Sequence, residues 1–325
     1  MNVTVGTFNL NNLFSRYNFE AEVESISNAE TKVDSEIEYK FGTDDVFRIR
    51  TYRGKLVKAK DSEDSKTVAE RIQSMDVDIL AVQEVEDLDT LKQFNRDYLG
   101  GMYDFCALIE GNDPRLIDVG FLTRHPIGCM TSWRYWVHPD DPGIPVFGRD
   151  MIQIEILDPI RSEKLFTIFN NHLKSHYVDY REDPVEGEQE NSLRRSRQAE
   201  MVAEIIKMQT RPDSSYIVLG DMNDSPDSSD IRAFTEDTEL NLVNSLSDPK
   251  ETRPPKADGD SPPPSSGSWT HRFKESGKPA TYDLYDHIWL SPRLSDKMVE
   301  AWIDRRTKHG GDGSDHDPAW IKLKL

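Results

Sequence analysis

Residues 314–318 read Ser-Asp-His-Asp-Pro, and this stretch decides how the rest of the chain is interpreted. It lies between a turn signal, Gly-Gly-Asp-Gly at 310–313, and an alternating apolar segment at 319–325 that predicts a strand. Asp315 and His316 therefore stand at the mouth of a strand, where loops carry function. An isolated Asp-His pair is more often a turn cap beside a solvated histidine, so residues from other segments have to decide between the two interpretations.

Two predicted strands early in the chain also end in polar side chains. Asn9 and Asn11 share a face at the end of the first strand. Glu84 follows the buried run 79–82, where a carboxylate is costly unless it meets a cation or hydrogen-bond donors. Ligands of α/β proteins collect at such strand ends. The alternative is that the asparagines shape a turn and that Glu84 caps a helix around residues 88–94.

The same pattern recurs in the second half of the chain. A predicted strand at 165–172, paired as a hairpin with 149–156, ends in His172. Another, at 216–219, runs into Gly-Asp-Met-Asn at 220–223, where Asp221 and Asn223 project the same way if the segment stays extended. Asp286 lies in an apolar strand and requires a partner if buried, and we expect that partner to be His316.

Length and composition fit one globular domain over residues 1–325. We expect a polar insertion over about residues 15–64, a Pro-rich surface loop over about residues 246–268, and helices beginning near Ser65 and Ser192. The formal net charge of -19 argues against a generally basic nucleic-acid-binding surface. It leaves open phosphate binding that is bridged locally by divalent cations.

Neither disulfide chemistry nor membrane insertion is indicated. The only cysteines, Cys106 and Cys129, lie among apolar residues. The N-terminus has no basic region and no long apolar run, so we expect no signal peptide in this chain and no membrane span. The chain would be soluble, cytoplasmic by default and secreted if an export signal has been removed. We expect a monomer without a protein partner.

The residue types at the strand ends favour hydrolysis of a phosphoester. They are carboxylates, amides and two histidines, and no serine or cysteine nucleophile occurs in a Gly-x-Ser-x-Gly motif. This set is typical of metal-assisted attack by water. Oxygen ligands favour Mg²⁺, with Mn²⁺ or Ca²⁺ as alternatives. Candidates for binding substrate phosphates, each otherwise an ordinary solvated surface residue, are Arg115, Arg149, Lys174 and Arg197.

Taken together, the short motifs resemble the endonuclease/exonuclease/phosphatase superfamily, which contains DNase I, exonuclease III and sphingomyelinases. They occur in the family's order over nearly the whole chain: Asn9-Leu10-Asn11, Gln83-Glu84, Asn170-Asn171-His172, Gly220-Asp221-Met222-Asn223, Asp286-His287-Ile288 and Ser314-Asp315-His316. The resemblance implies a four-layer α/β-sandwich, in which two packed, mostly antiparallel sheets are flanked by helices. It also implies a divalent-metal site at one end of the sandwich.

The resemblance further implies a role for each motif residue. Metal binding falls to Glu84, with Asn9 and Asp315 close to it and Asn11 near a second ion. Asp221 would orient or deprotonate the attacking water, and Asn223 would hold the phosphate. His316, paired with Asp286, would stabilise the phosphoryl transition state, and His172 would contact the phosphate or the leaving oxygen.

Three segments, at 9–14, 118–124 and 171–175, resemble bacterial nucleases of the extracellular type. They favour a nuclease acting on DNA or RNA, with endonuclease or exonuclease action left open. One alternative is a phosphatase or phosphodiesterase acting on a small phosphoester, a phosphoinositide or a phospholipid headgroup, which suits the acidic surface better than a long duplex. The other alternative is a catalytically inactive binding module.

Overall fold

The computed structural model describes residues 1–15, 51–52, 55–56, 60–179, 181–256, 262–264, 268–275, 277–307 and 312–325. Two sheets form its centre. The strands of the first are β1 (Asn2–Leu13), β4 (Ile79–Val85), β5 (Phe105–Leu108), β6 (Asp118–Thr123), β14 (Lys250–Glu251), β18 (Met298–Ile303) and β19 (Ala319–Lys324), in the spatial order β14-β18-β19-β1-β4-β6-β5. Most of the predicted insertion at 15–64 lies outside the described residues, which include there residue 15, the short strands β2 (Thr51–Tyr52) and β3 (Lys55–Leu56), and residues 60–64 with the start of a helix.

The second sheet contains the predicted hairpin at its middle. Its strands are β7 (Ile127–Ser132), β10 (Met151–Leu157), β11 (Lys164–His172), β12 (Tyr216–Asp221), β13 (Val243–Asn244) and β17 (Asp286–Leu290), in the order β13-β17-β12-β11-β10-β7. Two small hairpins, β8 (Val137–His138) with β9 (Asp141–Pro145) and β15 (His271–Phe273) with β16 (Thr281–Asp283), complete the strands. Most pairings in both sheets are antiparallel, while β1–β4, β11–β12 and β14–β18 are parallel.

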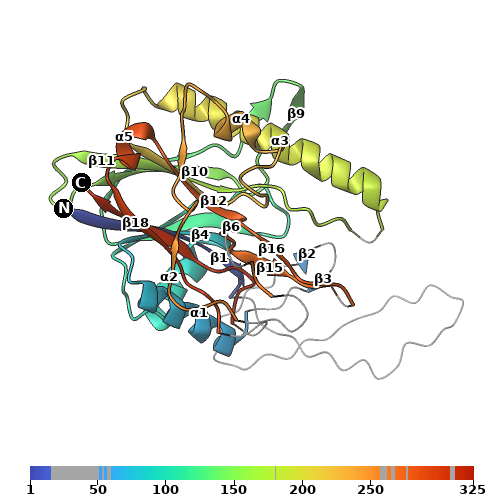
Figure 1. Ribbon diagram of the computed structural model, residues 1–325, viewed down its shortest axis with the longest axis horizontal. Helices are drawn as coiled ribbons and strands as arrows, with labels where there is room; N and C mark the ends of the chain where they lie inside the picture. Colours follow the sequence, from blue (N-terminus) through green and yellow to red (C-terminus); the bar gives the residue numbers. More distant parts are fainter. Residues whose placement is uncertain are drawn as a thin grey trace, which may run out of the picture.

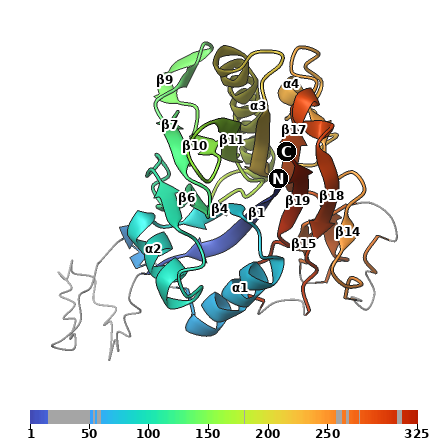
Figure 2. The ribbon, with the colours of Figure 1, turned by 90° about the vertical axis from the view of Figure 1, so that its left-hand side faces the viewer.

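The two sheets pack face to face, with helices on their outer faces (Figures 1 and 2). The central core joins apolar residues of both sheets, such as Val5 and Ile154. A second core lies between the six-stranded sheet and the helices α3 (Pro184–Gln209) and α4 (Arg232–Thr235). A third lies between the seven-stranded sheet and α1 (Ser62–Met75) and α2 (Leu88–Asp97). The four-layer α/β-sandwich is therefore confirmed.

Two helices begin earlier than their apolar spacing indicated. α1 starts at Ser62 because Asp61 caps it, accepting a hydrogen bond from the backbone N–H of Glu63. α3 starts at Pro184, capped by Asp183, and not near Ser192. Its first turns are polar and carry no apolar stripe, so periodicity could not show them. A short helix, α5 (Pro292–Ser295), follows β17.

The N-terminus and the C-terminus of the chain lie side by side. β1 and β19 are antiparallel neighbours, and the N-terminal amino group donates to the carbonyl of Leu325 (Figure 1). This pairing places the mouth of β19, with residues 314–318, beside the far end of β1. No described helix is both long and apolar enough to cross a membrane.

Candidate active site

Irregularities in β1 and β4 turn polar side chains toward one end of the sandwich. The register of the β1–β4 pair shifts between Asn9 and Leu13, and that of β4–β6 shifts between Val82 and Val85. Glu84 has a left-handed φ of 60° and Asn11 a φ of 46°. Non-glycine residues adopt this conformation only where the surroundings impose it, and bulges of this kind re-aim side chains next to functional sites. Asp87, not Glu84, caps α2, so Glu84 has no capping role.

Asp221 is the centre of the site. Its Oδ2 accepts a hydrogen bond from Asn9 Nδ2 at 2.9 Å, and its Oδ1 accepts one from the backbone N–H of Asn223 at 2.8 Å. Two imidazoles approach the same Oδ2, that of His172 with Nε2 at 3.5 Å and that of His316 with Nε2 at 3.7 Å. Residues from four distant segments therefore converge on a single carboxylate that is 1% exposed.

Gly220 makes this approach possible. Its φ is +123°, and a Cβ there would lie 2.0 Å from the carbonyl oxygen of Asn171 on the neighbouring strand β11. Only glycine tolerates both the backbone conformation and the contact. The glycine thus lets β12 stay paired with β11 while Asp221 reaches the site.

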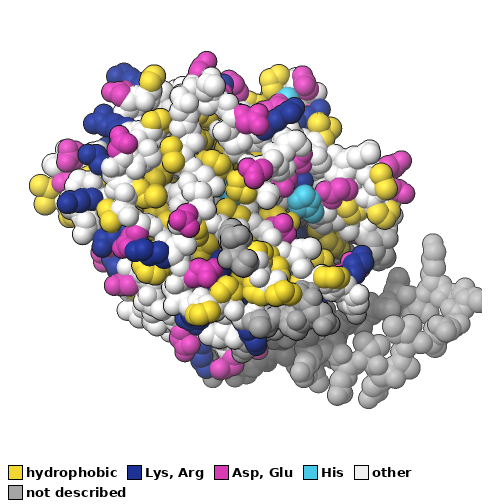
Figure 3. Space-filling model, in the orientation of Figure 1, with side chains coloured by type: hydrophobic (Ala, Val, Ile, Leu, Met, Phe, Trp, Pro, Cys, Tyr) yellow, Lys and Arg dark blue, Asp and Glu magenta, His cyan; other side chains and the backbone are white. Residues whose placement is uncertain are grey.

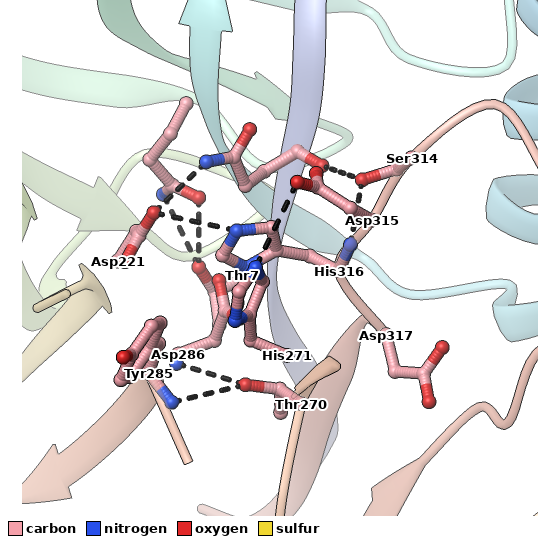
Figure 4. Close-up of polar contacts among 12 residues, drawn as sticks. Thr7, Asp221, Thr270, His271, Tyr285, Asp286, Ser314, Asp315, His316 and Asp317 are labelled. Carbon is pink, nitrogen blue, oxygen red and sulfur yellow. Dashed lines mark hydrogen bonds and ion pairs between the residues drawn. The ribbon is translucent and has the colours of Figure 1, made fainter. Parts of the chain in front are cut away.

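His316 is held by Asp286, the partner expected for it. The distance from His316 Nδ1 to Asp286 Oδ2 is 2.7 Å (Figure 4). The backbone N–H of Asp286 donates to Thr270 Oγ1, and that of His316 donates to Ser314 Oγ. This frame fixes the imidazole so that Nε2 faces Asp221.

The two histidines of the site differ in protonation state because different charges surround them. Burial would lower the pKa of His316, but the charges of Asp286 and Asp221 raise it well above its ordinary value. Burial also lowers the pKa of His172, and there the cations Arg149 and Arg115 lower it further. Burial and the charge of Asp286 raise the pKa of Asp221 to about 7. At neutral pH, His316 is therefore protonated and His172 is neutral.

Glu84 and Asp315 offer carboxylates toward one region. Glu84 Oε2 accepts from the backbone N–H of Asn12, and its Oε1 lies 4.0 Å from His172 Nε2. Burial lowers the pKa of Lys60, and the charges of Asp64, Glu84 and Asp315 oppose that effect. Glu84 and Asp315 thus both act on the ammonium group of Lys60, which donates to the carbonyl of Asn11. Oxygen donors in this arrangement fit a hard divalent ion.

Other ligand-capable atoms gather around His316. Those of Asp221, Asp286 and His316 lie within 4.8 Å of one another, and so do those of His271, Asp315 and His316. Glu84 is in neither group. Both polar atoms of the Asn9 side chain are used within the protein, since Oδ1 accepts from the N–H of Asn11. The metal roles of Asn9 and Asn11 stay predictions.

Three arginines hold the back of the same loop. Asp317, which is 0% exposed, accepts from Arg71 Nη2 at 3.1 Å, Arg306 Nε at 3.0 Å and Arg305 Nη1 at 3.4 Å. Arg71 also donates to the carbonyl of His316, and Arg306 donates to that of Asp315. In Figure 4 the Asp317 side chain points away from Asp221 and Asp286. The arginines thus fix the backbone that carries Asp315 and His316.

Three of the four predicted phosphate-binding residues lie together beside His172. Arg149 and Arg115 both pair with Asp113, and Arg149 Nη1 donates to the carbonyl of Leu173. The charge of Lys174 also acts on His172. Arg197 instead pairs with Asp141 of β9 at 3.1 Å, and its role in substrate binding stays a prediction.

The sequence did not identify several residues of this region. His271 forms an isolated bridge with His316 and stacks on Tyr285, with ring centroids 4.9 Å apart. Lys60 precedes α1 at the end of the predicted insertion. Asp317 was visible in the motif, but its three arginine partners come from α1 and the end of β18, and nothing local connects them.

The family comparison agrees with this geometry. Residues 6–316 match the model of the endonuclease/exonuclease/phosphatase family. The chain belongs to this family, whose members are hydrolases acting on phosphoester bonds and generally use a divalent metal. No curated protein matches the chain.

Solved structures share the fold at low sequence identity. An endonuclease/exonuclease/phosphatase family protein from Bacteroides thetaiotaomicron is 17% identical with a TM-score of 0.58, covering 99% of this chain and 97% of that one. A mannosyl-6-phosphatase from the same species is 17% identical with a TM-score of 0.54, covering 99% and 100%. An AP endonuclease from Archaeoglobus fulgidus is 13% identical with a TM-score of 0.57, covering 99% and 100%. These likenesses support the fold and do not select a substrate.

Proposed function

We propose that this protein is a metal-dependent phosphodiester hydrolase, and specifically a nuclease. The observation that carries the proposal is the convergence on Asp221 Oδ2 of Asn9, His172 and His316, with Asp286 behind His316. Such a group can accept a proton from water on one side and place positive charge against a phosphoryl group on the other.

Asp221 acts as the base in this proposal. Asn9 and the N–H of Asn223 fix the orientation of its carboxylate. Its raised pKa brings it near neutral pH, where a general base is most effective. The water oxygen bonds to phosphorus, its proton passes to Asp221, and the bond from phosphorus to the leaving oxygen breaks.

His316 stabilises the negative charge that develops on the phosphoryl oxygens. Asp286 keeps its imidazole protonated and oriented, as a buried carboxylate does in other acid–base pairs. His172, kept neutral by burial and by nearby cations, would hydrogen-bond the phosphate or the leaving oxygen. Asn223 would hold a phosphate oxygen.

Glu84 and Asp315 would hold the divalent ion, which we propose to be Mg²⁺. When bound, the ion would supply Lewis-acid polarisation of the phosphoryl oxygen. Its oxygen ligands would come from the two carboxylates whose charges already act together on Lys60.

A small phosphoester is the second candidate substrate. One structural neighbour carries the name of a mannosyl-6-phosphatase, and the chain's net charge of -19 opposes long-range attraction of a polynucleotide. An inactive binding module would keep the fold without turnover. Measuring which substrates the protein hydrolyses would distinguish these alternatives from a nuclease.

A substrate panel tests the proposal. Plasmid DNA, RNA, a nitrophenyl phosphodiester, a nitrophenyl phosphomonoester and phospholipid vesicles would be incubated with Mg²⁺ or Mn²⁺, with and without chelator. We expect chelator-sensitive cleavage of the nucleic acids and the diester that is lost in His316→Ala. Preferential turnover of the monoester or the lipid would replace the nuclease assignment, and no metal-dependent turnover of any substrate would support the binding module.

A further inference from the structure

The buried face of α3 changes from polar to apolar along the helix. Buried residues recur at Asn191, Arg195, Gln198, Val202 and Ile205, and this spacing of three or four residues marks one face. The first three are polar, whereas the last two belong to the core beside the six-stranded sheet. Burying a polar side chain costs free energy unless it forms hydrogen bonds, so the partners of the polar half indicate its role.

Arg195 and Gln198 both bind the backbone of Lys174. The backbone N–H of Lys174 donates to Gln198 Oε1 at 2.8 Å, and its carbonyl accepts from Arg195 Nη1 at 2.9 Å. The amide of Gln198 also donates to the carbonyl of Val146 at 3.0 Å. Lys174 lies two residues after His172, the last residue of β11. Side chains of α3 therefore fix both polar backbone groups of a residue in the loop after β11.

Arg195 also binds the loop after β12. Its Nε donates to Asp224 Oδ2 at 2.8 Å, and its Nη2 donates to Asp230 Oδ2 at 2.7 Å. Asp224 lies three residues after Asp221, at which β12 ends. One guanidinium group thus connects the loop after β11 to the loop after β12.

The two loops contact each other at Leu173. Its backbone N–H donates to the carbonyl of Asp221 at 2.9 Å, and its carbonyl accepts from Asn223 Nδ2 at 3.1 Å. The strand pairing of β11 with β12 ends at His172 and Asp221. Beyond that point, these loop contacts and the two side chains of α3 hold the chain.

Charge balance alone does not explain the placement of Arg195. Cationic and acidic side chains are interspersed on the surface that Figure 3 shows. Arg195 is instead buried, with 1% of its surface exposed. Pairing with two carboxylates compensates its charge. That compensation requires neither the further bond to the carbonyl of Lys174 nor a second α3 side chain on the N–H of the same residue.

We propose that Arg195 and Gln198 are positioning residues for the proposed hydrolysis. From α3 they fix the loops that follow His172 and Asp221, and so set the relative positions of these two groups. The inference rests on the proposed function and adds residues that do not themselves touch the reacting atoms. Small displacements matter, because misplacing a catalytic group by about 1 Å can lower a rate about a hundredfold.

Two substitutions remove these contacts with little change in side-chain size. Arg195→Lys keeps the positive charge, but a single ammonium group cannot replace a fork that binds two carboxylates and a carbonyl. Gln198→Met removes both hydrogen bonds of the amide. With Mg²⁺ and the nitrophenyl phosphodiester, we expect kcat to fall about tenfold or more in Arg195→Lys and about threefold or more in Gln198→Met. If Arg195 only balanced charge, lysine would keep kcat near the wild-type value.

Hydrogen exchange locates the defect without any substrate. In both variants the backbone N–H groups of Leu173, Lys174 and Asn223 should exchange about tenfold or more faster than in the wild type. The amides of β4, in the other sheet, should keep their wild-type rates. A general loss of stability would instead accelerate exchange in both regions.

Arg124→Lys is the matched control. Arg124 also joins two carboxylates, with Nη2 2.5 Å from Asp76 Oδ1 and Nη1 3.4 Å from Asp78 Oδ1. It follows Thr123, which pairs with Ile79 at the start of β4, whereas the site lies at the other end of that strand. The control should leave kcat and the exchange of the three loop amides at wild-type values.

The outcomes separate this inference from the proposed function. Wild-type exchange of the loop amides in both site variants, or an increase spread evenly over the chain, would overturn it. A local increase with kcat unchanged would overturn it as well. Gln198→Met decides the matter if Arg195→Lys does not fold. In a protein that hydrolyses no ester, the proposed function fails, and the exchange pattern still shows whether α3 fixes the two loops.

Discussion

The two aspartates that flank His316 face opposite environments. The Asp315 side chain is 54% exposed and pairs with His271, whereas Asp317 is fully buried behind the loop. Asp317 has three arginine partners, whereas among the described residues Asp315 pairs with an imidazole, with His271 Nε2 3.7 Å from its Oδ2. One peptide loop thus carries a matched carboxylate at its back and an under-matched one at its front.

This difference indicates different roles for the Asp317 side (the back) and the Asp315 side (the front) of the loop. A buried carboxylate that only secures structure is best matched by arginines, which bind it at several points and stay charged. The front of the loop adds Asp221, Asp286 and Glu84, and the carboxylates on this side act on His316 and Lys60. In the part of the chain that the structure describes, none of these carboxylates pairs with an arginine at the distances seen for Asp317. In the proposed function, a bound divalent metal would supply further positive charge there. Substitutions on the two sides should therefore produce different kinds of defect.

We expect the largest effect on activity from substitutions at the front of the loop. His316→Ala and Asp221→Ala should each lower kcat by about a thousandfold or more, since each removes a group that acts on the transferring proton or the phosphoryl charge. Thermal unfolding should remain cooperative in both variants. Rates within a few-fold of wild type in either variant would remove that residue from the mechanism.

A substitution at the back of the loop should mainly lower the stability of the protein. Asp317→Asn leaves Arg71, Arg305 and Arg306 without their shared carboxylate, and breaking a buried ion-pair network costs about 3 kcal/mol or more. Urea unfolding would measure the loss. Because Arg306 also fixes the carbonyl of Asp315, the variant should require more metal for half-maximal activity. The exposed Asp296, changed to asparagine, is the control; a loss no greater than in this control would contradict the proposed role of the back.

Glu84→Gln sharpens the role of the front. The substitution keeps the size of the side chain and removes the charge that acts toward Lys60 and Asp315. We expect the metal concentration for half-maximal activity to rise about tenfold or more, with a smaller change in the rate at saturating metal. Glu63→Gln, at an exposed pair with Lys66, is the control. An unchanged metal dependence would move the ligand role to another carboxylate.

The sequence predicted the front of the site better than its back. Asp221 and His172 are the last residues of their strands and Glu84 is the last but one, so the local apolar pattern places all three at strand ends. Their motifs also carry the family resemblance, which the match over residues 6–316 confirms. The four-layer sandwich was likewise implied by this resemblance.

Sequence could not show the contacts made through tertiary structure. Arg305 and Arg306 read as ordinary surface cations, yet both are buried against Asp317. His271 contacts His316 through an isolated backbone bridge and through their rings, whose centroids are 4.9 Å apart, and the two residues come from distant segments. The polar start of α3 depends on a cap by Asp183 and on packing, and an apolar stripe does not mark it. Long-range ion pairs and caps leave no periodic signal.

The smallest expected effect is on stability, and its sign should differ between Asp221→Asn at the front and Asp317→Asn at the back. Burial and Asp286 raise the pKa of Asp221 to about 7, above the ordinary value of 3.8 that applies to the unfolded chain. A carboxyl whose folded pKa is raised contributes stability at low pH that is lost as pH rises from about 4 to about 7. Asparagine does not titrate in this range, so Asp221→Asn should not show this loss of stability with rising pH. Without metal, the variant should gain about 1–2 kcal/mol relative to wild type between pH 5 and pH 8, seen as a difference in Tm that grows by about 2–4 °C. The sign is the opposite of that expected for Asp317→Asn at neutral pH, because Asp317 is matched by arginines and Asp221 is not. A Tm difference between Asp221→Asn and wild type that stays constant across this pH range would mean that the front carboxylates are compensated within the protein, and the contrast between the two sides would fail.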